Sequence, residues 1–310
     1  MFTKTAVLAF EPMPHLETIK VHAGANSLQE HAPLSKLAYY NNKIAVVTGA
    51  GSGIGRAIAH ALSANGCKVY CTDIDLAAAT RVAGELNNAH ARHLDVADAA
   101  AVSAFADEVF AREGRVDLLF NNAGVGHAGA VVDTELADWK WVMEINVMGV
   151  VHGIHYFLPR MLKQKGPAHI INTASGAGII PMPRTAPYCA SKHAVVGLSQ
   201  SLAGELHGTN VGITILCPGT INTAIIKNTK MSGSTAQASQ AQAVAHYAKK
   251  GTSPDQVAAD VLEAVVKDKL FCVTPRKEVG LGWLLMRLSP GLMQRIMRAR
   301  MNQVEGVKAR

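Results

Sequence analysis

A tyrosine, a lysine and a serine stand at spacings that suit proton transfer. Tyr188 and Lys192 are four residues apart, so their side chains share one face of a helix. An ammonium group beside a phenol stabilises tyrosinate, and we therefore expect Lys192 to lower the pKa of Tyr188. Such a phenol can serve as a general acid or base. Ser175 precedes Tyr188 by thirteen residues and follows a predicted strand, Ile170–Thr173.

A glycine-rich loop near residue 50 supplies a second chemical feature. The apolar run Ile44–Val47 predicts a buried parallel strand, and helical spacing begins at Ala57 and ends at Asn65. Between them lie four glycines, Gly49, Gly51, Gly53 and Gly55. A loop without Cβ atoms lets the backbone approach a phosphate, and the helix that follows presents free N–H groups. The sequence therefore predicts a pyrophosphate site.

An acidic residue follows at the distance expected of a ribose ligand. Asp73 ends the second predicted strand, Lys68–Thr72, and lies 24 residues after Gly49. A carboxylate there accepts hydrogen bonds from ribose hydroxyls and repels a 2′-phosphate, which favours NAD over NADP. The alternative is an ordinary strand-end or N-cap aspartate, but the glycine loop at this distance favours the ribose role.

Strand and helix patterns alternate along the rest of the chain. This alternation predicts an α/β fold, a single-domain Rossmann-like doubly wound parallel sheet of about seven strands with helices on both faces. Further strands are expected at 90–96, 116–120, 170–173, 211–216 and 271–274. Further helices are expected at 76–86, 99–112, 136–165, 188–207 and 253–267. Pro159 is expected to bend or break the third of these helices.

Three regions follow from these patterns. Residues 1–40, interrupted by prolines, are predicted to be an N-terminal extension, and residues 41–275 the catalytic domain. Within the domain, residues 221–250 are rich in Ser, Thr, Ala and Gln and predict a substrate lid, because long loops in compact domains are usually functional. Residues 276–310 form a basic amphipathic tail.

The tail carries most of the net charge of +7, since residues 276–310 hold eight basic and two acidic residues. Its apolar positions form one stripe, Leu292, Met293, Ile296, Met297 and Met301. A basic amphipathic segment of this kind is compatible with peripheral contact with an anionic membrane. Packing of the stripe on the protein or on a sister subunit is the favoured alternative.

Composition and motifs argue against several other classes of protein. The five cysteines are scattered without a CxxC pair, which predicts reduced thiols and a cytoplasmic protein. The thirteen histidines include no HExxH-like pair, and no metal site is expected. No apolar run reaches the roughly 18–20 residues needed to cross a bilayer. No nucleic-acid-binding motif accompanies the basic tail, so nucleic acid is not an expected partner.

With these motifs in one fixed order, residues 41–275 resemble the short-chain dehydrogenase/reductase superfamily. The family's TGxxxGxG loop matches Thr48–Gly55, and its NNAG motif matches Asn121–Gly124. The resemblance implies four catalytic residues, Asn146, Ser175, Tyr188 and Lys192. It also implies a set of cofactor-binding residues that includes Tyr188 and Lys192 again, with Gly49, Ser52, Gly53, Ile54, Gly55, Asp73, Asp95, Val96, Asn122, Ala123, Gly124, Pro218, Gly219 and Thr223.

The resemblance further implies the reaction. An NAD-dependent oxidoreductase would interconvert a secondary alcohol and its ketone, with Tyr188 as general acid/base and Ser175 hydrogen-bonded to the substrate oxygen. Lys192 would lower the Tyr188 pKa and hold the nicotinamide ribose, while Asn146 would fix a helix kink and a proton-relaying water. Family members commonly form homodimers or homotetramers, here through helices 136–165 and 188–207.

The expected substrate is an apolar small molecule, because apolar residues dominate the candidate pocket walls. Those walls are Val125, Gly126 and His127, then Gly178, Ile179, Ile180, Met182 and Pro183, and in the lid Ile221, Ile225 and Ile226. Arg184, His127 or Lys227 could meet a carboxylate or thioester, so a 3-oxoacyl or 3-hydroxyacyl thioester reductase is the alternative enzyme. A non-catalytic NAD-sensing scaffold is the alternative from another class.

Overall fold

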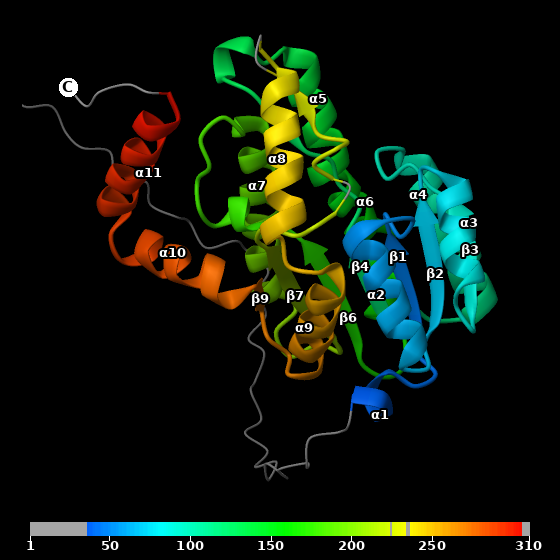
Figure 1. Ribbon diagram of the computed structural model, residues 1–310. Helices are drawn as coiled ribbons and strands as arrows, with labels where there is room; N and C mark the ends of the chain where they lie inside the picture. The colour runs from blue at the N-terminus through cyan, green and yellow to red at the C-terminus, as the bar shows by residue number, and fades with distance from the viewer. Residues whose placement is uncertain (1–35, 224, 234–235, 306–310) are drawn as a thin grey trace, which may run out of the picture. The chain divides into compact units, whose positions relative to one another are not determined.

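A seven-stranded, wholly parallel sheet forms the centre of the computed structural model (Figure 1). The structure describes residues 36–223, 225–233 and 236–305, which lie in one compact unit. The strands are β1 (Ile44–Thr48), β2 (Lys68–Asp73), β3 (Ala89–His93), β4 (Leu118–Asn121), β6 (Ala168–Thr173), β7 (Val211–Pro218) and β9 (Phe271–Thr274). Their spatial order is β3-β2-β1-β4-β6-β7-β9, which confirms the predicted α/β fold.

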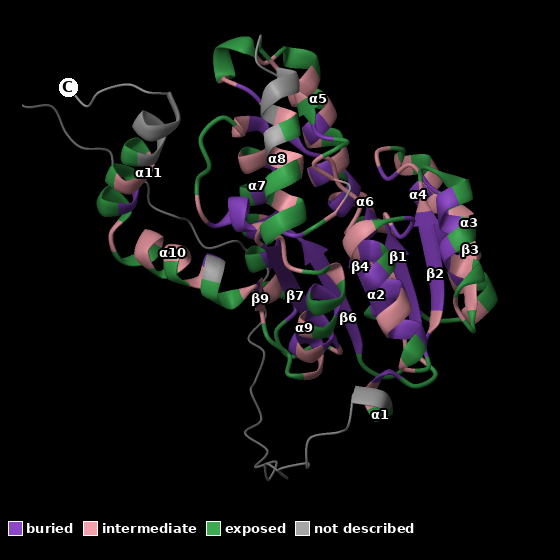
Figure 2. Cartoon of the chain, viewed as in Figure 1, coloured by how far each residue is buried: buried purple, intermediate pink, exposed green. Residues whose placement is uncertain are grey.

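Helices cover both faces of the sheet, and Figure 2 shows the central strands buried between them. One core lies under α2, α3 and α9 with the short α1, and the other under α4, α6 and α7. The helices are α1 (Lys36–Tyr40), α2 (Gly53–Ala64), α3 (Leu76–Gly84), α4 (Ala99–Glu113), α5 (Leu136–Met143), α6 (Gly149–Met161), α7 (Ala186–Glu205), α8 (Ala236–Lys250) and α9 (Pro254–Val266). Burial on both faces explains why β1 and β4 are apolar throughout their central positions.

The strand order reverses between β1 and β4. Val46 of β1 pairs with Tyr70 of β2 on one side and with Leu119 of β4 on the other. Because all seven strands are parallel, the loops that follow them emerge at one edge of the sheet. In doubly wound sheets, ligands bind at such a reversal, outside the carboxyl ends of the strands.

Two predicted elements differ from the structure near this edge. The predicted helix 136–165 is divided into α5, a π-helical turn at Glu144–Met148 and α6. Pro159 lies inside α6, which continues to Met161. The strand predicted at 90–96 ends earlier, at His93, so Asp95 and Val96 belong to the loop that follows β3.

The predicted lid is more ordered than a long loop. It contains α8 and a short strand, β8 (Lys230–Met231), that pairs in parallel with β5 (His127–Ala128). The next residue after β5, Gly129, donates a backbone hydrogen bond of 2.7 Å to Arg184 and forms a bridge with Thr185. β5 therefore joins the lid on one side to the chain that enters α7 on the other.

The predicted tail contains two helices, α10 (Arg276–Leu288) and α11 (Pro290–Glu305), which follow β9 (Figure 1). No helix in the described ranges combines the length and apolar character needed to span a membrane. Of the predicted N-terminal extension, residues 1–40, only α1 falls within the described residues.

Candidate active site

The loop after β1 is a bare backbone cradle at the start of α2. Gly49 has a φ of 65°, and a Cβ there would lie 2.9 Å from the Cα of Ala123. A Cβ on Gly55 would lie 2.1 Å from the Gly49 carbonyl oxygen, so both positions require glycine. Ser52 is the N-cap of α2, yet its side chain makes no capping hydrogen bond. A cradle of this kind at a helix N-terminus fits the pyrophosphate of a dinucleotide.

Asp73 lies at the carboxyl end of β2, beside this cradle. Its Oδ2 accepts a hydrogen bond of 2.9 Å from the Gly51 N–H, and its Oδ1 accepts one of 3.0 Å from the Asp75 N–H. A Cβ on Gly51 would come within 2.8 Å of Asp73 Oδ2. The carboxylate is thus fixed at the rim of the loop and half-buried, a position from which it can still accept hydrogen bonds from a ribose.

The turn after β4 is fastened to the glycine loop through Thr48. The hydroxyl oxygen of Thr48 accepts hydrogen bonds from the backbone N–H groups of Asn122 and Ala123, at 2.9 and 3.0 Å. In return, Asn122 Nδ2 donates to the Thr48 carbonyl oxygen at 3.0 Å. The two segments with predicted cofactor contacts therefore form one rigid block.

Asp95 and Val96 lie in the loop after β3. Asp95 is half-buried, and its Oδ1 accepts a hydrogen bond of 2.9 Å from the Ala97 N–H. The Val96 carbonyl oxygen lies 2.8 Å from Nδ1 of His152, which fastens this loop to α6. Pro218 ends β7, and the Gly219 N–H donates a hydrogen bond of 2.7 Å to Thr274.

Asn146 is fully buried in the π-helical turn between α5 and α6. Its Oδ1 accepts a hydrogen bond of 2.8 Å from the Val125 N–H, and its Nδ2 donates to the Val125 carbonyl oxygen at 3.0 Å. The same Nδ2 donates to Ser191 Oγ at 3.0 Å. One amide thus ties the chain after the NNAG motif to α7. A π turn supplies the extra residue that places a side chain off the regular helical path.

Ser175, Tyr188 and Lys192 come together at the ends of β6 and α7. Ser175 caps the 3₁₀ turn after β6, accepting a hydrogen bond of 3.1 Å from Ala177, and its side chain shares a hydrogen bond with Tyr188. Lys192 Nζ donates to the Thr173 carbonyl oxygen at 2.9 Å and lies 5.9 Å from the centroid of the Tyr188 ring. The three side chains thus lie next to one another.

The model of the short chain dehydrogenase family matches residues 43–232 of this sequence. The chain belongs to this family. The probable oxidoreductase EphD of Mycobacterium tuberculosis is 35% identical over 285 residues, which are 84% of this chain and 47% of EphD. The chain therefore spans about half the length of that relative.

Two further relatives of this short-chain dehydrogenase are informative. Meso-2,3-butanediol dehydrogenase of Serratia marcescens is 41% identical over 186 residues, which are 59% of this chain and 73% of the relative. The crystal structure of a short-chain dehydrogenase/reductase from Burkholderia phymatum in complex with NAD has a TM-score of 0.76 and 35% identity, and covers 82% of this chain and 95% of its own. The resemblance inferred from the sequence motifs is therefore confirmed.

Burial governs the ionisation of the two central groups of this short-chain dehydrogenase. Burial raises the pKa of Tyr188 to about 12, although the hydrogen bond from Ser175 opposes the rise. Burial lowers the pKa of Lys192 to about 8. We expected the pKa of Tyr188 to be lowered, but it is raised, because the effect of desolvation is larger than that of the hydrogen bond with Ser175. Near neutral pH Tyr188 is therefore a protonated phenol.

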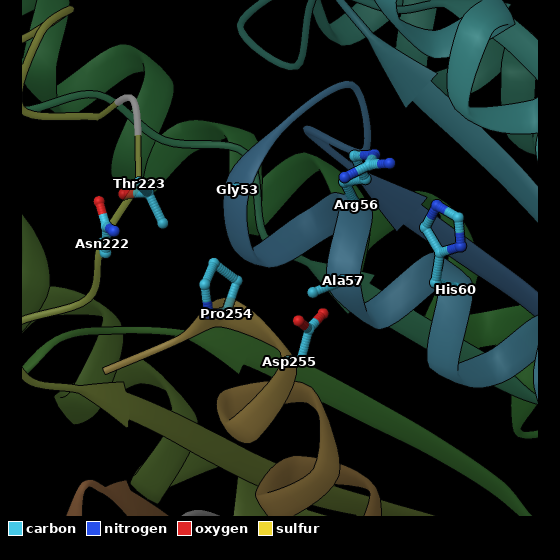
Figure 3. Close-up of a pocket in the computed structure, with 8 residues that line it drawn as sticks. All are labelled: Gly53, Arg56, Ala57, His60, Asn222, Thr223, Pro254 and Asp255. Carbon is cyan, nitrogen blue, oxygen red and sulfur yellow. The ribbon is translucent and has the colours of Figure 1, made fainter. Parts of the chain in front are cut away.

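A cleft of about 490 Å³ runs along the outside of the glycine loop (Figure 3). Its lining residues are Gly53, Arg56, Ala57, His60, Asn222, Thr223, Pro254 and Asp255. Figure 3 shows Thr223 facing Gly53, and a Cβ on Gly53 would lie 3.3 Å from the Thr223 side chain. The start of the predicted lid therefore lies next to the glycine loop.

The predicted substrate walls of the short-chain dehydrogenase separate into two groups. Ile179 and Ile180 pack in one apolar cluster with residues of α7, β7 and α10. Ile221, by contrast, is buried in the core under α2 and α9, so the structure does not place it on the expected substrate wall. It lies three residues after the end of β7 and forms a β-bridge with Thr252, just before α9.

His127 was expected to be able to meet a carboxylate or thioester of the substrate, but it lies in the protein interior. Its ring is buried, with Nε2 lying 3.1 Å from Ser232 Oγ and 3.5 Å from Asp138 Oδ2. Lys230 of the lid reaches the same carboxylate at 3.2 Å. His127 therefore contributes to the attachment of the lid to α5.

α10 contributes positions at the substrate side that the sequence analysis did not single out. A Cβ on Gly282 would lie 2.7 Å from Cδ1 of Ile180, and a Cβ on Gly176 would lie 3.3 Å from Val279. The first turns of α10 therefore press against the loop between Ser175 and Tyr188. In the sequence, Gly280 and Gly282 could have indicated this contact, because a glycine inside a helix often marks a place where another segment packs closely against the helix.

Proposed function

We propose that this short-chain dehydrogenase is an NAD-dependent oxidoreductase that interconverts an apolar secondary alcohol and its ketone. The observation that carries the proposal is the convergence of Ser175, Tyr188 and Lys192 beside the glycine cradle. The butanediol dehydrogenase of Serratia, named for an alcohol substrate, supports alcohol–ketone chemistry.

NAD is the proposed cofactor, because Asp73 presents a carboxylate at the rim of the cradle. A negative charge there attracts ribose hydroxyls and repels the additional phosphate of NADP. The NAD complex of the Burkholderia structure supports the same choice. Besides Asp73, the cradle amides of Gly49–Gly55 and the block around Asn122 would hold the dinucleotide.

Tyr188 is the proposed proton donor and acceptor. A bound nicotinamide supplies or accepts the hydride, and the protein must then move one proton at the substrate oxygen. In the reductive direction, the protonated Tyr188 hydroxyl gives its proton to the carbonyl oxygen and becomes a phenolate. In the oxidative direction, Tyr188 must first lose its proton, and the phenolate then takes one from the alcohol. Ser175 orients that oxygen and stabilises the charge that develops on it.

Lys192 and Asn146 are proposed to support this transfer. The buried ammonium of Lys192 lies close enough to stabilise the phenolate that remains after proton donation. Asn146 holds the backbone of Val125 and the hydroxyl of Ser191, and so joins the chain after the NNAG motif to the helix that carries Tyr188. The apolar cluster around Ile179 and Ile180 favours a substrate without fixed charge.

A substrate panel with the full chain tests this function. Apolar secondary alcohols, their ketones, a sugar alcohol and a 3-oxoacyl thioester would be assayed with NAD and NADP, or with the reduced cofactors, by nicotinamide absorbance. We expect turnover of apolar alcohols and ketones with the NAD couple. Preferential turnover of the thioester would favour the alternative reductase, and cofactor binding without any turnover would favour a non-catalytic sensor.

A further inference from the structure

α10 has an inner face that packs on the catalytic domain. Val279 is only 4% exposed, and Gly282 lies against Ile180. The ring of Trp283 lies 4.9 Å, centroid to centroid, from that of Phe271 in β9. These contacts fix the orientation of the helix, so its opposite face is determined as well.

That opposite face carries a stripe of exposed leucines. Leu281, Leu284 and Leu288 are 73%, 53% and 75% exposed, and their spacings of three and four residues align them along the helix. Leu292, at the start of α11, is 46% exposed. Figure 2 shows exposed and half-buried segments along both helices. Single exposed leucines are ordinary, but three aligned on α10, with Leu292 also exposed at the start of α11, point to a contact surface.

Basic side chains accompany the leucines. Residues 276–305 include six basic and two acidic residues. Exposed cations lie at both ends of the stripe, with Lys277 before it and Arg295 and Arg298 after it. Arg287 lies within the stripe and stacks over Trp283, with 5.4 Å between its guanidinium carbon and the ring centroid.

We propose that α10 and α11 dock on an anionic membrane surface, with the leucine stripe entering the headgroup layer and the cations facing lipid phosphates. An amphipathic basic segment without the length to span a bilayer has this preferred position. A second copy is a poorer partner, because a two-fold self-contact would bring like charges such as Arg295 and Arg298 together.

Docking in this way would place the substrate side next to the lipid. The same helix that carries the leucines touches Ile180 through Gly282, and Ile180 is an expected substrate wall. An apolar substrate could then pass from lipid to pocket without crossing bulk water. This last step depends on the proposed function, whereas docking itself does not.

Sedimentation of the full chain with vesicles tests the docking. Vesicles of phosphatidylcholine alone would be compared with vesicles that also contain phosphatidylserine, at low and high salt. We expect the protein to pellet with the anionic vesicles and to be released by salt. The variant Leu281→Ser/Leu284→Ser/Leu288→Ser should lose binding. In Lys277→Gln/Arg295→Gln/Arg298→Gln, the loss of each positive charge should weaken partitioning about fivefold.

A matched control removes three exposed apolar side chains elsewhere, in Val132→Ser/Leu136→Ser/Leu162→Ser. It should pellet like the wild type, and circular dichroism should show that all variants remain folded. A wild-type chain that stays in the supernatant overturns the docking, and so does equal loss in the control. If light scattering shows that the leucine variant lowers the particle mass while vesicle binding persists, the stripe is a contact between copies instead. Sedimentation needs no turnover, so a failed substrate panel leaves it unaffected.

Discussion

Lys192 donates a hydrogen bond of 2.9 Å from its ammonium group to the carbonyl oxygen of Thr173, and its side chain is almost completely buried. The hydrogen bond satisfies one of three N–H donors. Burial lowers the pKa of Lys192 to about 8, so the folded protein binds its proton less tightly than the unfolded chain does. The buried charge of Lys192 therefore lowers the stability of the fold at neutral pH.

Replacement of this lysine should stabilise the fold at neutral pH. In Lys192→Met the buried charge is absent, and we expect the free energy of unfolding to rise by about 1–3 kcal/mol near pH 7. The unfolded chain holds the extra proton between the folded pKa of about 8 and the ordinary value of 10.5, so the wild type gains stability as pH rises through this window. The difference should therefore vanish toward its upper end.

Urea unfolding across this pH range measures the effect, with Lys267→Met as the control. Lys267 is exposed and pairs with Glu263 on α9, so its removal should change stability little at any pH. A Lys192→Met protein that is less stable than the wild type throughout the range would contradict the assigned burial cost.

Removal of the Tyr188 hydroxyl should abolish turnover while leaving the cofactor site intact. Tyr188→Phe keeps the ring but loses the proton, and we expect kcat to fall by about 10²–10⁴. The dissociation constant of NAD, followed by fluorescence, should change little. Tyr156→Phe on α6 is the control and should retain activity. Wild-type kcat in the Tyr188 variant would show that another group moves the proton.

Neutralising Asp73 should weaken discrimination between NAD and NADP. Asp73→Asn keeps an oxygen that can accept the hydrogen bond from Gly51 but loses the charge. We expect kcat/KM with NAD to fall about tenfold and the ratio of NADP to NAD use to rise, because a hydrogen bond to a charged group contributes about 1.5–3 kcal/mol. Asp75→Asn alters a neighbouring carboxylate that caps α3, and there the ratio should stay as in the wild type.

Truncation of Asn146 should destabilise the protein as well as impair catalysis. Asn146→Ala leaves the N–H and carbonyl groups of Val125, which is half-buried, without their partner. We expect the free energy of unfolding to fall by about 2–4 kcal/mol. Asn88→Ala, at an exposed position, should differ from the wild type by less than about 0.5 kcal/mol. Equal unfolding midpoints for both variants would show that the Val125 hydrogen bonds contribute little.

A methyl group added at Gly282 should alter substrate binding but not cofactor binding. The new Cβ would lie 2.7 Å from Cδ1 of Ile180, which must shift within the substrate wall. We expect KM for a bulky apolar substrate to change several-fold, with KM for NAD unchanged. Gly280→Ala is the matched control, because its Cβ meets only the Arg276 side chain at 3.5 Å and both variants gain about 0.5–1 kcal/mol of helix stability. The same KM change in both would exclude the Ile180 contact as its cause.

The parallel sheet could be predicted because strands that are buried on both faces consist of consecutive apolar residues. The last strand, Phe271–Thr274, was predicted with the bounds observed. The pairing of β5 with β8 could not be predicted, since two-residue strands bonded through their backbones leave no pattern in side-chain types. Nor could the burial of Ile221, which depends on the packing of α2 against α9.

The residues of the candidate site could be predicted from the sequence, but the direction of their pKa shifts could not. The spacing of Tyr188 and Lys192 identified a pair on one helix face, and the structure brings Ser175 to the same place. The direction of the Tyr188 pKa shift depends on desolvation, and burial of a particular hydroxyl cannot be derived from spacing alone. The resemblance implied a helix kink at Asn146, and the structure has a π turn there, but the apolar periodicity on both sides of this turn predicts one continuous helix.

The two-residue strand β5 has a mechanical consequence. The Ser232 N–H donates to Ala128 of β5 and the Lys230 N–H donates to Gly126 just before it, while Gly129 just after β5 donates to Arg184, four residues before Tyr188. A displacement of residues 230–232 would therefore be transmitted through this backbone to the segment that precedes Tyr188. If the proposed lid and the proposed acid are correct, reshaping the lid to accept a different molecule would also move the phenol, so a change of substrate would be accompanied by a change in rate.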